Sequence, residues 1–237
     1  MPLNAGHIIP PPILAKRMTL APAMTIKLVR HGQSLANTHE ALPHVSGDAG
    51  IGLTALGKQQ AIAVGESLGS DYLTEAVIYT SPYERTRATT TLLLQGAGLE
   101  NTVKVYEDPR LREAERGYTE EGDQFALRKI HGWFYYRHTG GESAADCYDR
   151  TSAFLESMMR GAQRRRAQRF LIVAHGMTIR CFVMRFLHLT VEQFVSMADL
   201  GNCDIVTIAP IAEVKDPVFQ TARWGVTGLK LRQAAPR

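Results

Sequence analysis

The chain has 237 residues, of which 45% are hydrophobic and 21% are charged. This composition supplies enough apolar sequence for a full core, and it excludes a disordered tail, a collagen-like fibre and a disulfide-stabilised miniprotein. Lysine and arginine number 27 against 23 aspartate and glutamate residues, which gives a net charge of +4. This charge suits an anionic substrate but is too small to require a nucleic acid partner.

Cysteine usage and the lengths of apolar runs indicate the cellular setting. The three cysteines, Cys147, Cys181 and Cys203, are far apart and form no CxxC pair. We therefore expect a reducing, cytoplasmic location. Apolar runs such as residues 170–174 are much shorter than the roughly 18 residues that a membrane-spanning helix requires, so we expect no membrane partner.

Proline content separates the first residues from the rest of the chain. Residues 1–23 contain five prolines and no periodic apolar pattern, so we expect a disordered or mobile extension. Whether this extension is native, targeting or a misassigned start is left open. Residues 24–226 show no internal repeat or linker and are interpreted as one catalytic domain, followed by a C-terminal tail at 227–237.

Within this domain, short runs rich in β-branched residues alternate with amphipathic helical stretches. The alternation predicts an α/β fold, a three-layer sandwich with a mostly parallel central sheet and helices on both faces. Thr54 and Gly69 are expected to cap and stop the first helix, and Pro82 to lie in the first turn of the second. In chain order, the expected elements are strand 25–29, helix 54–68, strand 76–80, helix 82–94, strand 103–106, helices 123–136 and 142–169, strand 170–174, helix 177–187, and strands 204–208 and 219–224.

The first strand runs directly into Arg30, His31 and Gly32. Ligands of open α/β sheets collect at the carboxyl ends of the strands, so a cation and an imidazole are expected at a binding crevice. Gly32 allows the backbone to turn tightly and approach an anion, and residues 33–37 supply further amide and hydroxyl donors, Gln33 and Asn37 among them. The pattern predicts a phosphate-binding loop that contains a nucleophile.

Three further groups are expected at the same edge of the sheet. The strand 170–174 delivers His175 and Gly176 immediately before a helix, and Arg85 lies at the start of the helix that follows strand 76–80. Glu113 follows the third strand and could protonate a leaving alcohol. Glu115 competes with Glu113 for this role.

Taken together, these motifs resemble the histidine phosphatase superfamily, which includes the cofactor-dependent phosphoglycerate mutases and related phosphatases. The resemblance implies a phosphoglycerate mutase-like fold. It also implies that His31 is the phosphorylated nucleophile, that Arg30, Arg85 and His175 hold the phosphoryl group with help from Asn37, and that Glu113 is the proton donor. The matching segments are LVRHGQSLAN at 28–37, LTALG at 53–57, TSPYER at 80–85, LRE at 111–113, GES at 141–143 and VAHG at 173–176.

This resemblance favours a phosphomonoester hydrolase that needs neither a metal nor a cofactor, because arginines and histidines already neutralise the transferring group. Only residues 118–140 separate the Glu113 motif from the GES motif, whereas the glycolytic mutases carry a longer insertion there. A short segment leaves water better access to a phosphohistidine, so hydrolysis is expected to exceed phosphotransfer. A phosphoglycerate mutase-type phosphotransferase and a catalytically silent phospho-ligand binding protein are the alternatives.

The expected partner is a small phosphorylated substrate, and homodimerisation is left open. The basic run from Arg160 to Arg169 lies near the end of a long predicted helix, where cations interact favourably with the helix dipole. We interpret this run as a solvated surface and not as a nucleic acid site. The identity of the substrate does not follow from these motifs.

Overall fold

The computed structural model describes residues 24–43, 47–117 and 121–232. The extension expected at 1–23 lies outside these residues. A single seven-stranded sheet in the order β3-β2-β4-β1-β5-β7-β6 organises the domain. Its strands are β1 (Thr25–Arg30), β2 (Ala76–Thr80), β3 (Val105–Glu107), β4 (Arg169–Ala174), β5 (Ile205–Pro210), β6 (Phe219–Gln220) and β7 (Trp224–Thr227).

The sheet is mixed, and its parallel half carries the expected crevice. The neighbours β3, β2, β4 and β1 pair in parallel, whereas β5 pairs antiparallel with β1 and the β5-β7-β6 half continues antiparallel. Parallel pairing aligns strand ends, so Arg30 of β1 lies beside Ala174 of β4, and Thr80 of β2 lies beside Val173. The segments that follow these strands therefore leave the sheet at the same edge.

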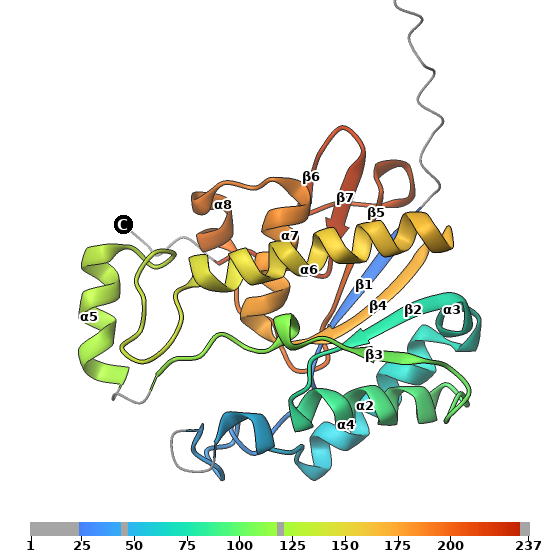
Figure 1. Cartoon of the computed structure of the whole chain (residues 1–237), viewed down its shortest axis with the longest axis horizontal. Coiled ribbons are helices and arrows are strands. Elements are labelled where there is room, and N and C mark those ends of the chain that lie inside the picture. The colour runs from blue at the N-terminus through green and yellow to red at the C-terminus, as the bar shows by residue number, and fades with distance from the viewer. Residues whose placement is uncertain (1–23, 44–46, 118–120, 233–237) are drawn as a thin grey trace, which may run out of the picture.

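Helices cover both faces of the sheet, as the sequence pattern predicted (Figure 1). Side chains alternate along β4, so Phe170 and Ile172 join one core while Leu171 and Val173 join the other. The first core includes residues of α6 (Ala144–Arg165) and α7 (Gly176–Leu187). The second includes residues of α2 (Ala55–Leu68), α3 (Ser70–Glu75) and α4 (Glu84–Gly96). The three-layer sandwich is confirmed.

The helix α2, which packs against the loop that follows β1, begins and ends where the sequence predicted. Thr54 caps α2, because its hydroxyl accepts a hydrogen bond from the Gly57 amide at 3.0 Å. Gly69 follows Leu68 with a φ of 74°, a conformation that glycine adopts at little cost. Local capping chemistry thus determined both ends of α2.

Several other boundaries differ from the sequence-based expectations. The second helix, α4, begins at Glu84 with Pro82 before it, and α5 (Glu121–His131) ends early because Gly132 takes a φ of 85°. The helix expected at 142–169 ends at Arg165, since Arg166 adopts a left-handed conformation with a φ of 53°. The short helices α3 and α8 (Val191–Ser196) were not predicted.

The last part of the domain extends beyond the boundary expected at residue 226. The strand expected at 219–224 is a hairpin of β6 and β7, and β7 continues to Thr227. Leu229 is buried, and Leu231 forms an antiparallel bridge with Met197. No helix in the described ranges is both long and apolar enough to cross a bilayer.

Gly57 packs directly against the loop that follows β1. A Cβ atom at this position would lie 2.0 Å from the carbonyl oxygen of Gln33, so substitution must move either α2 or the loop. We expect Gly57→Ala to lower the free energy of unfolding by about 1–3 kcal/mol, as overpacking does in other cores. Urea denaturation measures this loss. Gly52→Ala is the matched control, because a Cβ atom there meets open space, and an equal loss in both variants would contradict the explanation.

Candidate active site

The candidate site lies at the carboxyl ends of β1, β4 and β2. The chain leaves these strands through His31, His175 and Ser81. Backbone hydrogen bonds continue the sheet beyond the strands, since the His31 amide donates to the Ala174 carbonyl at 3.0 Å and the Ser81 amide to the Val173 carbonyl at 3.1 Å. Sheet register therefore brings together two histidines separated by more than half of the chain.

His31 is buried and held in one tautomer. Its side chain is 3% exposed, and Nδ1 lies 2.8 Å from the carbonyl oxygen of Gly32. A carbonyl can only accept, so Nδ1 carries the proton and Nε2 keeps a free lone pair. Burial, followed by the nearby Arg85 charge, lowers the pKa of His31 from 6.5 to about 3. The ring is therefore neutral at physiological pH.

His175 lies next to His31, with ring centroids 5.2 Å apart in an edge-to-face arrangement. The side chain is fully buried, and Nε2 lies 2.9 Å from the hydroxyl oxygen of Ser81. Burial and then the charge of Arg85 hold the pKa of His175 well below its usual value. His175 is also the residue before α7, so it lies at the positive end of a 12-residue helix.

Arg85 contributes a fixed cation to the same group. Its guanidinium is almost fully buried and binds the carboxylate of Asp48 through two bonds, from Nη1 at 2.8 Å and from Nη2 at 3.1 Å. It also lies over the ring of Tyr83, with 4.9 Å between the guanidinium carbon and the ring centroid. Asp48 was not predicted, because nothing in the local sequence links it to an arginine 37 positions away.

Gln33 and Asn37 lie in the loop that follows β1, and their side chains make hydrogen bonds that fix the shape of this loop. The amide oxygen of Gln33 accepts a bond from the Thr54 hydroxyl at 2.9 Å, which ties the loop to the cap of α2. Asn37 Oδ1 accepts from the Ser34 amide at 3.1 Å and from Asn202 Nδ2 at 3.0 Å. The structure therefore places Gln33 and Asn37 beside His31, where these bonds brace the loop.

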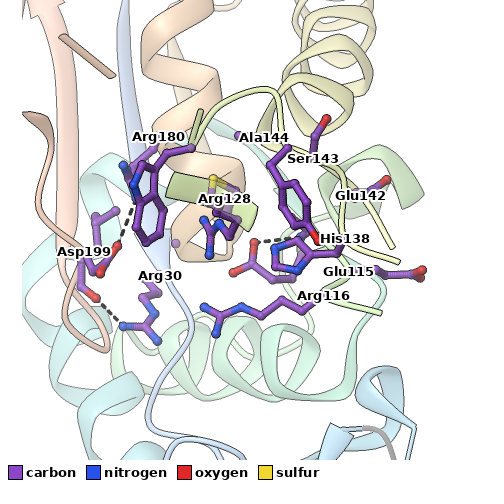
Figure 2. Close-up of a pocket in the computed structure, with 17 residues that line it drawn as sticks. Arg30, Glu115, Arg116, Arg128, His138, Glu142, Ser143, Ala144, Arg180 and Asp199 are labelled. Atoms are coloured by element: carbon purple, nitrogen blue, oxygen red, sulfur yellow. Dashed lines mark hydrogen bonds and ion pairs between the residues drawn. The ribbon is translucent and has the colours of Figure 1, made fainter. Parts of the chain in front are cut away.

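A cavity of about 270 Å³ adjoins these residues (Figure 2). Arg30, Glu113 and Gly176 line it on the side of the loop and α7, and Trp133 and Tyr136 line it from the segment after α5. Burial lowers the pKa of Arg30, and the negative charge of Glu113 opposes that shift, so the two groups interact electrostatically. His31 and Arg85 do not line the cavity, whereas Arg30, the neighbour of His31 in the chain, does.

The two candidate acids both border this cavity but differ in their surroundings. Glu113 is half-buried, and one of its carboxylate oxygens accepts a bond from the Ala114 amide at 3.0 Å. Glu115 is exposed. The carboxylate of Glu142, in the GES motif, binds Arg112 and Arg150, so it has a structural role. Within the described ranges, no three histidine, cysteine, aspartate or glutamate side chains form a group that could hold a metal ion.

Comparisons with known proteins agree with this geometry. The histidine phosphatase superfamily (branch 1) matches residues 26–224. A phosphoglycerate mutase-like protein of Arabidopsis thaliana is 34% identical over 200 residues, which are 76% of this chain and 71% of that protein. A probable phosphoglycerate mutase of Salmonella paratyphi C is 33% identical over 217 residues, 86% of this chain and 89% of that protein. The solved structure of a mycobacterial glucosyl-3-phosphoglycerate phosphatase shares the fold, with a TM-score of 0.67 at 23% identity over 87% of this chain and 98% of the other.

The two buried histidines make stability depend on pH. Below the unfolded-state pKa of about 6.5, the unfolded chain binds protons at these positions and the native state does not, so the free energy of unfolding falls as pH decreases. For His31 this fall continues toward its folded pKa of about 3, and the folded pKa of His175 is also well below its usual value. The expected loss is about 1.4 kcal/mol per pH unit for each histidine. Urea midpoints at about pH 7 and about pH 5, without phosphate, should therefore differ less in His31→Gln than in the wild type. His131→Gln, which removes an exposed histidine, should behave as the wild type, and equal pH dependence in all three proteins would contradict this account.

Proposed function

The chain belongs to branch 1 of the histidine phosphatase superfamily, and we propose that it is a phosphomonoester hydrolase that works through a phosphohistidine at His31. The observation that carries this proposal is the state of His31. The ring is buried and neutral, its Nδ1 is bound to the Gly32 carbonyl, and two guanidinium groups lie nearby. An imidazole held in this way has its Nε2 lone pair available to attack phosphorus.

The first step transfers the phosphoryl group to the enzyme. Nε2 of His31 forms a bond to phosphorus while the bond to the leaving oxygen breaks, and protonated Glu113 gives its proton to that oxygen. Arg30 and Arg85 bind the equatorial oxygens, where their planar guanidinium groups neutralise charge. The carboxylate of Asp48 holds Arg85 in place before the substrate arrives.

The second step returns the enzyme to its starting state. Glu113, now ionised, removes a proton from a water molecule, whose oxygen attacks phosphorus as the bond to His31 breaks. The products are inorganic phosphate and the neutral imidazole. No metal or cofactor takes part in either step, because the arginines and the helix end at His175 supply the positive charge.

A mutase-type phosphotransferase is the second candidate. The names of the Arabidopsis and Salmonella relatives favour it, and Arg116 and Arg128 line the cavity, where they could bind a second anionic group. The short segment 118–140 favours hydrolysis, because it leaves less chain to enclose a second acceptor hydroxyl and exclude water.

One preparation can compare the two activities. With excess EDTA present, we expect phosphate release from phosphomonoesters to exceed conversion of 3-phosphoglycerate to 2-phosphoglycerate in the presence of bisphosphoglycerate. His31→Ala should abolish both activities, and acid-labile phosphate should appear on His31 in the quenched wild-type enzyme. Faster conversion than phosphate release would replace the hydrolase by the mutase, and full activity in His31→Ala would remove the nucleophile assignment.

The choice between Glu113 and Glu115 can be tested with leaving groups of different basicity. An alkoxide needs a proton as it leaves and an aryl oxide needs it much less, so we expect Glu113→Gln to reduce kcat/KM, which reports on transfer to His31, about 100-fold or more for alkyl phosphates and much less for aryl phosphates. Glu115→Gln is the matched control and should change kcat/KM for both substrates little. The reverse ranking of the two variants would make Glu115 the acid.

A further inference from the structure

Arg30 is held by the loop that enters β5. Its backbone amide donates to the Asp204 carbonyl at 3.1 Å, its carbonyl accepts from the Cys203 amide at 3.1 Å, and its guanidinium donates through Nη1 to the Leu200 carbonyl. The same loop contacts the nucleophile, since Asn202 Nδ2 donates to the His31 carbonyl at 3.2 Å. The position of residues 199–204 therefore determines where the Arg30 side chain points.

Arg180 fixes the start of this loop from α7. Its Nη1 donates to Asp199 Oδ1 at 3.0 Å, and its Nη2 donates to the Phe194 carbonyl at 3.1 Å. The Arg180 side chain is 6% exposed, whereas that of Asp199 is 82% exposed, so the arginine is the fixed partner and the loop is the part that it holds. Figure 2 shows Arg180, Asp199 and Arg30 on one side of the cavity.

The C-terminal segment supports the same loop from a second direction. Arg232 donates through Nε to the Met197 carbonyl at 3.0 Å, and its Nη2 lies 3.6 Å from Asp199 Oδ1. The Ala198 amide donates to the Lys230 carbonyl at 2.8 Å. Asp199 is thus bound by two arginines from different parts of the chain, one residue before the carbonyl that receives Arg30.

We propose that Arg180 is a positioning residue for phosphoryl binding, which acts through Asp199 and the Leu200 carbonyl to orient the guanidinium of Arg30. This inference rests on the proposed function, in which Arg30 binds the transferring group. A guanidinium displaced by about 1 Å loses alignment with the phosphoryl oxygens, and such displacements reduce catalysis strongly. The helix that places His175 at its start therefore also orients Arg30.

A direct contact between Arg180 and the substrate makes a different prediction. Arg180 and Asp199 also line the cavity, where they could touch the leaving group. Inorganic phosphate has no leaving group, so it reports on the phosphoryl-binding groups alone. A positioning role changes phosphate binding, whereas a leaving-group contact changes only the kinetics of larger substrates.

The experiment measures the dissociation constant of inorganic phosphate by calorimetry in purified full-length variants. Asp199→Asn removes the charge from an exposed side chain with little change of shape, so folding should survive. We expect phosphate to bind about tenfold more weakly, which corresponds to about 1.4 kcal/mol, and KM for phosphomonoesters to rise more than kcat falls.

Arg180→Lys keeps the charge but cannot make both hydrogen bonds, so its loss of phosphate affinity should be intermediate. Glu75→Gln is the matched control, because it removes the 3.0 Å ion pair with Arg169 at the opposite end of the sheet.

A double-mutant cycle tests whether Asp199 affects phosphate binding through Arg30. If Asp199 acts through Arg30, adding Asp199→Asn to Arg30→Ala should weaken phosphate binding no further. The positioning role is excluded if Asp199→Asn binds phosphate as the wild type does, if it impairs only substrates with large leaving groups, or if its full effect persists in Arg30→Ala. Wild-type protein that fails to bind phosphate would overturn the proposed function together with this inference, whereas phosphate binding without hydrolysis would overturn the proposed function alone.

Discussion

Burial of positive and titratable groups at one edge of the sheet is the constraint on which this structure depends. Two guanidinium groups and two imidazoles lie together, and like charges at such distances repel unless oxygen atoms compensate them. The protein supplies an internal hydrogen-bond partner to each group. Asp48 binds Arg85, the Leu200 carbonyl binds Arg30, the Gly32 carbonyl binds His31, and the Ser81 hydroxyl contacts His175.

This arrangement also explains why the histidines are neutral. Burial is the largest cause of the lowered pKa values of both imidazoles, and the arginines, which remain charged even when they are buried, disfavour the protonated rings further. Arg85 lowers the pKa of both rings. In the proposed mechanism, a phosphomonoester dianion entering the site would meet fixed cations and a neutral imidazole, which is the combination that phosphoryl transfer to nitrogen requires.

The sequence predicted the parts of the site that follow directly from strand ends. His31, His175 and Arg85 each come within a few residues of a β-rich run, so parallel pairing was enough to bring them together. Asp48 and Leu200 could not be found in this way, because one contact spans 37 positions and the other uses a backbone carbonyl, which every residue carries. The same limit applies to the fold. The capped ends of α2 were predictable, whereas the contact between Leu231 and Met197 depends on tertiary packing.

Because β5 runs antiparallel to β1, the site receives side chains from some segments and backbone groups from another. Segments that leave β1, β4 and β2 deliver side chains, whereas the segment that enters β5 runs beside the end of β1 and delivers mainly carbonyl oxygens to Arg30. A carbonyl is present whatever the residue, so these bonds to Arg30 do not depend on which side chains stand at positions 200 and 204. The side chains have other roles, because Leu200 is buried in the core and Asp204 Oδ2 accepts a bond from the Gly201 amide at 2.6 Å. Mutational tolerance should therefore be uneven within this loop, lower at Asp199 and Asn202, whose side chains make hydrogen bonds, than at a position that contributes only its carbonyl to Arg30. Insertions and deletions in residues 200–204 should be tolerated least, because they would shift the carbonyls themselves.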